Sequence, residues 1–137
     1  MKKTLLLLLV LFTFVGMANA QKIKFKKGKV LVDGVECLNY DSSDPNQVMI
    51  STLDNSQTIF LKSIRTGVGQ NDGLYSKVVF AEQKKSLTSR SYIFTRGILV
   101  KKLISNKVLD NCTIDPSKMD NFILRYDEQI EERLIRH

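Results

Sequence analysis

The sequence has few of the residue types that carry most hydrolytic and metal-dependent chemistry. In 137 residues it has no tryptophan, two cysteines and a single histidine, which is the last residue, His137. A terminal side chain frays and is solvated, so His137 is a poor general base and a serine or cysteine triad lacks its partner. The absence of tryptophan argues against a stacking platform for sugars or bases. We therefore expect a non-enzymatic protein that needs no cofactor.

The two cysteines, Cys37 and Cys112, are too few and too far apart for the usual cysteine sites. They form no Cys-x-x-Cys redox motif, and no further cysteine or histidine pair completes a zinc site. An even number of cysteines in an oxidising compartment favours a disulfide. We predict a bridge between Cys37 and Cys112, which requires a Cα separation below about 7 Å.

The first twenty residues are organised as a secretory signal peptide. A positive start at Lys2-Lys3 precedes the apolar run Leu5 to Val15, and Ala18-Asn19-Ala20 has the small-x-small pattern of a cleavage site. The apolar run is shorter than the roughly 20 residues of a spanning helix. A lipoprotein would need cysteine at the position of Gln21. We predict cleavage between Ala20 and Gln21, with no stable membrane insertion afterwards.

The expected mature chain is one basic domain, residues 21–137, that is periplasmic or secreted. Removing 20 of 137 residues leaves 117, and the loss of two lysines lowers the formal charge from +7 to +5. This length can bury a core without metals. The lysines are interleaved with apolar residues, and export separates the chain from nucleic acid. We expect a protein or an anionic envelope component as partner, and no nucleic acid.

The first half of this domain reads as antiparallel hairpins. Asp33-Gly34 is a strong two-residue turn signal, which sets Val32 opposite Val35 and Val30 opposite Cys37, with all four side chains on one face and Cys37 inside. A turn at Asn55-Ser56 would set Ile50 opposite Leu61 and Thr52 opposite Ile59. A further strand covers Tyr75 to Glu82. We predict a β-meander of about five strands.

The second half changes to helical spacing. From about Ser89, apolar residues recur at three- and four-residue intervals as far as Ile104. A second helix begins with Asp115 as N-cap and Pro116 at its first position, and its apolar stripe runs from Met119 to Leu134. The sequence therefore predicts an α+β fold in which two C-terminal helices pack on one sheet face.

A glycine-rich stretch between the strands is a candidate binding element. Gly67, Gly69, Asn71, Asp72 and Gly73 lie in a segment whose glycine spacing fits neither a dinucleotide fingerprint nor a Walker loop. We interpret it as a flexible hairpin loop, and mobile surface loops carry binding function more often than packed strands do.

The acidic residues offer weaker candidates. The segment from Asp110 to Asp115 lacks the central glycine and terminal glutamate of a calcium loop. Asn111-Cys112-Thr113 fits the N-glycosylation pattern, which matters only in a host with that machinery. A solvated helix face accounts for three glutamates near the C-terminus, Glu128, Glu131 and Glu132. A carboxylate hydrolase would need convergence of two among Glu36, Asp41, Asp44 and Asp72.

Several segments resemble the small, uncharacterised exported proteins of Bacteroidetes-type bacteria. They are the lead Met-Lys-Lys-Thr, the mature start Gln21 to Phe25, the hairpin Val32 to Glu36, and the stretches Val108 to Asp110 and Arg125 to Glu128. The resemblance implies export and an α+β fold, and it transfers no active site. Three functions stay open: a binding or accessory domain, a hydrolase using carboxylates, and a carrier of an apolar ligand, suggested by a sheet that is apolar on both faces.

Overall fold

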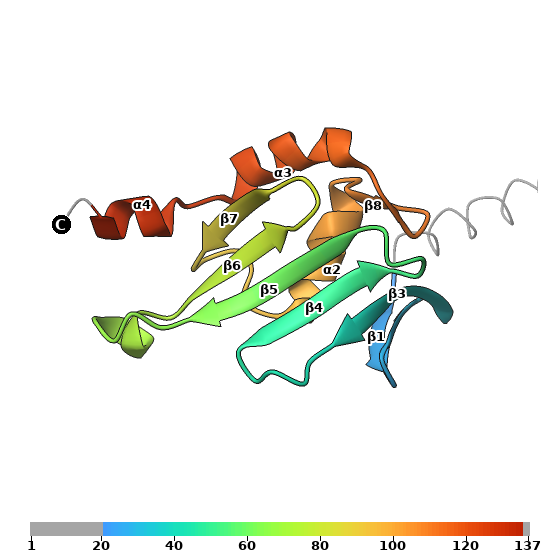
Figure 1. The fold of residues 1–137 in the computed structure, drawn as a ribbon, viewed down its shortest axis with the longest axis horizontal. Helices are drawn as coiled ribbons and strands as arrows, with labels where there is room; N and C mark the ends of the chain where they lie inside the picture. Colours follow the sequence, from blue (N-terminus) through green and yellow to red (C-terminus); the bar gives the residue numbers. More distant parts are fainter. Residues whose placement is uncertain (1–20, 136–137) are drawn as a thin grey trace, which may run out of the picture.

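The computed structural model describes residues 21–135, so the signal-peptide prediction, apart from Gln21, and His137 lie outside the described residues. Seven antiparallel strands form one sheet in the order of the sequence, from β1 to β7, and the helices follow them (Figure 1). This confirms the predicted α+β meander. The strand count is seven rather than about five. The strands are β1 (Ile23–Lys26), β2 (Lys29–Val32), β3 (Val35–Asp41), β4 (Gln47–Thr52), β5 (Thr58–Ile64), β6 (Tyr75–Phe80) and β7 (Lys85–Ser89).

Two tight turns fix the first three strands. Lys27-Gly28 and Asp33-Gly34 both have positive φ at their two central residues, which is the geometry that matches the twist of a two-residue hairpin. Val32 pairs with Val35 as predicted. Glycine is suited to the second position of each turn because it reaches positive φ without a Cβ clash.

A β-bulge in the β2–β3 ribbon corrects the predicted register. Val30 pairs with Leu38 and Leu31 with Glu36, so Cys37 is the extra residue. The bulge places both Cys37 and Leu38 inside, at 2% and 1% exposure, whereas Val35, which we predicted to share the face of Cys37, is 63% exposed. An extra residue shifts the side-chain alternation by one, which a strict period-2 reading does not anticipate.

The β4–β5 register also differs from the prediction. Ile50 pairs with Ile59, and Val48 takes the place opposite Leu61. The reason is a longer loop, closed by the Thr52 amide donating to the Gln57 carbonyl at 3.0 Å. Asp54 organises this loop by accepting hydrogen bonds from the Thr52 and Ser56 hydroxyls, both at 2.7 Å. Side-chain hydrogen bonding of this kind competes with the two-residue turn.

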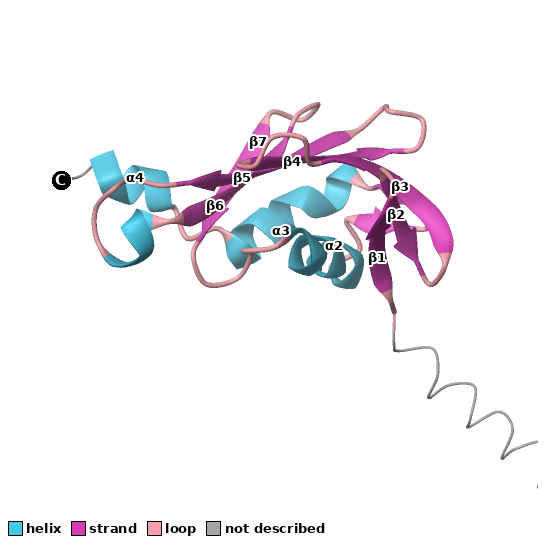
Figure 2. Ribbon diagram, turned by 90° about the horizontal axis from the view of Figure 1, so that it is seen from below, coloured by secondary structure: helices cyan, strands magenta, loops and turns pink. Residues whose placement is uncertain are grey.

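Helices α2 and α3 cover one face of the sheet (Figure 2). Helix α2 (Arg96–Ser105) begins after Thr95, whose hydroxyl caps the Ile98 amide. A small hairpin of β8 (Leu109–Asp110) and β9 (Thr113–Ile114) follows. Asp115 then caps a 3₁₀ turn at Pro116–Lys118 that leads into α3 (Met119–Tyr126). Asp115 and Pro116 therefore start the helical segment as predicted, but its first turn is a 3₁₀ turn and the α-helix begins at Met119.

The last predicted helix is interrupted. Helix α3 ends at Tyr126 and a separate helix, α4 (Ile130–Ile135), begins after three intervening residues. Asp127 accepts from the Gln129 amide at 3.0 Å, and Gln129 has φ 53. The predicted apolar stripe continues across the break to Ile130, which is 4% exposed, but it does not reach Leu134, which is 43% exposed.

The main core lies between the sheet and the helices. Phe80 of β6 meets Phe122 of α3 edge to face, with ring centroids 6.1 Å apart, and both rings are fully buried. Leu99, Val100 and Leu103 supply the face of α2. The core cluster also contains Val30, Leu38, Ile50, Ile59, Leu61, Val78 and Leu87 from the sheet.

Segment 127–131 closes the β7 edge. The Thr88 amide donates to Asp127 Oδ1 at 3.0 Å, and the Thr88 carbonyl accepts from the Glu128 amide at 2.8 Å. Pairing these groups covers the outer edge of β7 at Thr88, where an outer strand would otherwise present open hydrogen-bonding groups. Helix α4 then contacts β6 through Glu131, which hydrogen-bonds to Tyr75 and Lys77. Side chains alternate between the two faces of a strand, so Tyr75 and Lys77 lie on the face opposite to Phe80 and away from α3.

Candidate functional site

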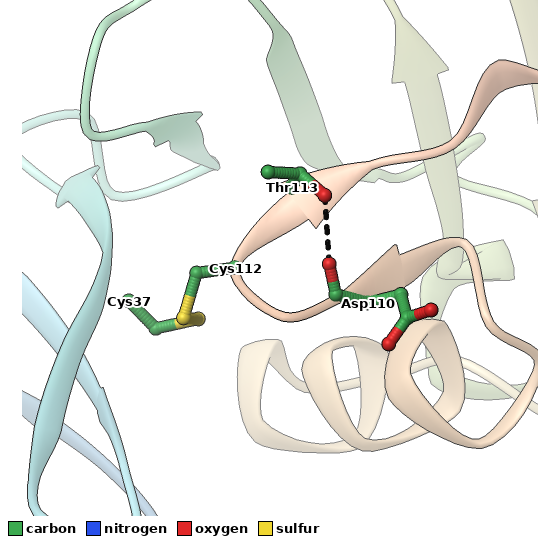
Figure 3. Close-up of a disulfide and its surroundings, with 4 residues drawn as sticks. All are labelled: Cys37, Asp110, Cys112 and Thr113. Carbon is green, nitrogen blue, oxygen red and sulfur yellow. Dashed lines mark hydrogen bonds between the residues drawn. A yellow bond between two sulfur atoms is a disulfide. The ribbon is translucent and has the colours of Figure 1, made fainter.

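The structure joins Cys37 and Cys112 in a disulfide, with their Cα atoms 4.9 Å apart (Figure 3). Cys37 comes from the bulge in β3 and Cys112 from the tip of the β8–β9 hairpin. Asn111 and Cys112 both have positive φ, at 51° and 63°, as a two-residue turn between Asp110 and Thr113 requires. The Thr113 hydroxyl donates to the Asp110 carbonyl at 2.7 Å and braces the turn. The disulfide therefore ties the C-terminal half to the first ribbon.

A groove lies on each side of the hairpin tip. One, of 440 Å³, is lined by the β4–β5 loop, including Leu53 and Asp54. The other, of 360 Å³, is lined by Gln21, Val35 and Lys107 among others. The Thr52 hydroxyl, followed by Ser56, lowers the pKa of Asp54 to about 2. These hydrogen bonds within the loop give Asp54 a structural role.

The glycine-rich segment forms a compact loop between β5 and β6. The Gly67 amide donates to the Asp72 carbonyl at 2.9 Å, and Arg65 bridges to Asp72 at 3.5 Å. Gly73 is buried at φ +63, and a Cβ there would lie 1.8 Å from the Thr66 hydroxyl oxygen. Only glycine fits this position without displacing the loop.

The same loop borders a hollow of 430 Å³, which we call the loop hollow. Its lining comes from the loop and from the end of β7: Val68, Gly69, Gln70, Asn71, Gly73, Leu74 and Arg90. Of the five residues predicted from the sequence, Gly69, Asn71 and Gly73 line it. Gly67 and Asp72 do not line it and instead hydrogen-bond to each other, which closes the loop. Figure 1 places this loop and α4 at the end of the molecule opposite β1.

Arg90 is positioned by Glu128, a residue that we predicted to lie on a solvated helix face. One carboxylate oxygen of Glu128 accepts from the Arg90 and Ser91 amides at 2.6 and 2.8 Å and from the Ser89 hydroxyl at 3.0 Å. Burial raises the pKa of Glu128, but the Ser91 and Arg90 amides and the serine hydroxyls together outweigh it and leave that pKa lowered. Glu128 thus holds the chain at the end of β7.

Glu131 also has a structural role rather than a solvated one. It bridges to Lys77 at 2.8 Å and accepts from the Tyr75 hydroxyl at 3.0 Å. The hydrogen bond from Lys77 lowers the pKa of Glu131. Burial, followed by the bond to Glu131, raises the pKa of Tyr75. Glu132, the third glutamate of this group, is exposed.

The other carboxylates considered for catalysis are turn or surface residues. Glu36, Asp41, Asp44 and Asp72 are all exposed. Asp41 accepts from the Ser43 amide at 2.9 Å and Asp44 from the Asn46 amide at 2.8 Å, so both serve turns. Within residues 21–135, no group of three His, Cys, Asp or Glu side chains is placed to hold a metal ion.

Comparison with protein families, curated proteins and solved structures found no match to this chain. In the described part of the chain, no helix has the length and apolar composition needed to cross a membrane.

Two important residues escaped the sequence analysis. Arg90 follows a strand, β7, that we did not predict because Leu87 is its only large apolar residue. The sequence places Glu128 in a continuous helix, so its contacts with residues 37 to 39 positions away could not be anticipated. The apolar spacing continues from Tyr126 to Ile130 without interruption, so the sequence carried no signal of this break.

Proposed function

We propose that this chain is an exported, non-enzymatic binding domain that recognises a protein or an envelope component through the glycine-rich loop. The observation that carries the proposal is the loop hollow itself, a concave site formed where the sequence predicts the binding element. Its volume falls in the range of about 300–1,000 Å³ typical of ligand sites.

The exposed apolar residues of the loop support recognition rather than packing. Val68 is 77% exposed and Leu74 is 37% exposed, and both line the hollow. Large apolar side chains at the rim of a concave site gain free energy when a partner covers them. The signal-like leader and the disulfide support export, because such bonds persist in oxidising compartments.

The test is a pull-down from envelope extract with the mature chain and two matched variants. Val68→Asp places a charge in the hollow, and Leu124→Asp places the same charge on α3 at a side chain that is 83% exposed. We expect Val68→Asp to lose the captured partner and Leu124→Asp to retain it. Equal recovery with both variants would remove the loop from the proposal.

A further inference from the structure

The position of Arg90 suggests what the loop hollow binds. Its backbone is fixed on both sides. Glu128 accepts from the amides of Arg90 and of the following Ser91, and the hydroxyl of the preceding Ser89, which is fully buried, accepts from the Tyr92 amide at 2.9 Å. A side chain that projects from a fixed backbone loses less conformational entropy when it binds.

The acidic residues around Arg90 already have partners. Glu128 accepts from the Ser91 hydroxyl at 3.1 Å in addition to its other donors, and Glu131 is engaged by Lys77 and Tyr75. Asp72 is paired with Arg65. Among residues 21–135, the Arg90 guanidinium has no ion pair within 4.0 Å. Arg90 therefore contributes to the lining of the hollow a cation that forms no ion pair with the described residues.

This cation lies beside apolar surface and amide side chains. Val68 and Leu74 line the hollow together with Gln70 and Asn71. A planar guanidinium pairs with a carboxylate through two parallel hydrogen bonds. The two amide side chains can donate to and accept from a peptide backbone.

We propose that the loop hollow receives a polypeptide segment that places a carboxylate against Arg90 and an adjoining apolar side chain against Val68 and Leu74. The inference rests on the proposed function and specifies its partner. The carboxylate comes from a free C-terminus or from an acidic side chain, and the experiment distinguishes these two sources.

The test is fluorescence polarisation of labelled peptides with the mature chain. An array of peptides with apolar C-terminal residues is prepared with free carboxylates, with amidated ends, and with amidated ends plus an internal glutamate. We expect the amidated peptides to bind roughly tenfold more weakly than their carboxylate counterparts, the weakening expected from losing a charged hydrogen bond. The internal glutamate restores binding only if a side-chain carboxylate suffices.

Two charge-removing variants provide the control. Arg90→Gln should abolish the preference for carboxylates, whereas Lys101→Gln, on the exposed face of α2, should keep it. Arg90→Lys should restore it only in part, because an ammonium lacks the planar fork. An array in which no peptide binds, or a preference that survives Arg90→Gln, overturns the inference. The inference is also overturned if the mature chain binds phosphatidylglycerol vesicles but none of the peptides.

The same variants separate the two proposals in the pull-down. Loss of the partner with Val68→Asp but not with Arg90→Gln would keep the loop as the binding element and reject the carboxylate. Retention of the partner with both would reject the loop itself.

Discussion

Breaking the disulfide is the most quantitative test of the fold. Cys37 and Cys112 are 75 positions apart, and the chain-entropy relation for a loop of that length gives about 4.5 kcal/mol at about 25 °C. Replacing both cysteines by alanine should therefore lower the free energy of unfolding by about 3 to 4.5 kcal/mol. In urea, that loss moves the midpoint by about 2 to 3 M for a chain of this size.

Position 112 provides an internal control. Cys112 has φ 63, where a residue with a Cβ is strained and glycine is not. With Cys37→Ala as the common background, Cys112→Gly should thus be more stable than Cys112→Ala by about 1 kcal/mol. Reduced wild-type protein isolates the bond from the side-chain changes.

The assay is urea unfolding of the mature chain followed by far-ultraviolet circular dichroism, since the sequence has no tryptophan to report by fluorescence. Oxidised and reduced protein with the same midpoint would refute the loop-closure reasoning. A Cys112→Gly variant less stable than the alanine variant would refute the turn geometry at the hairpin tip.

Two further predictions concern the β7 edge and the core. The pKa of Glu128 is lowered from 4.5 in the folded protein, so its stabilisation is present above that pH and is lost as the pH falls through the folded-state value. Glu128→Gln should lower the free energy of unfolding at neutral pH by about 1 to 2 kcal/mol. It should also flatten the decline in urea midpoint that the wild type shows below about pH 4.5. Parallel pH profiles of the urea midpoint for wild type and variant would contradict this. Phe122→Ala should lower the free energy of unfolding by about 3 to 5 kcal/mol because Phe122 is only 1% exposed. The control Leu124→Ala, at an exposed position, should change it by less than about 0.5 kcal/mol. A loss below about 1 kcal/mol for Phe122→Ala would show that the contact with Phe80 contributes little to stability.

The sequence was most informative where a local signal decides the backbone. Asp33-Gly34 fixes a hairpin turn, and Asp115 and Pro116 mark the start of a helical segment, since each acts on its immediate neighbours. The same holds for the glycine-rich loop, which was located correctly.

The prediction failed where distant residues decide. The bulge at Cys37 and the break after Tyr126 depend on partners far along the chain, and neither alters the local composition. The hollow could not be foreseen for the same reason, because Arg90 reaches the loop only after the sheet has formed.

The disulfide also imposes an order on biosynthesis. Cys112 emerges from the ribosome or a translocation channel 75 residues after Cys37, so the native bridge cannot form until all seven strands of the sheet, which ends at Ser89, are available to fold. Oxidation then becomes one of the last steps of maturation, and any thiol that reaches Cys37 earlier would compete with the native partner.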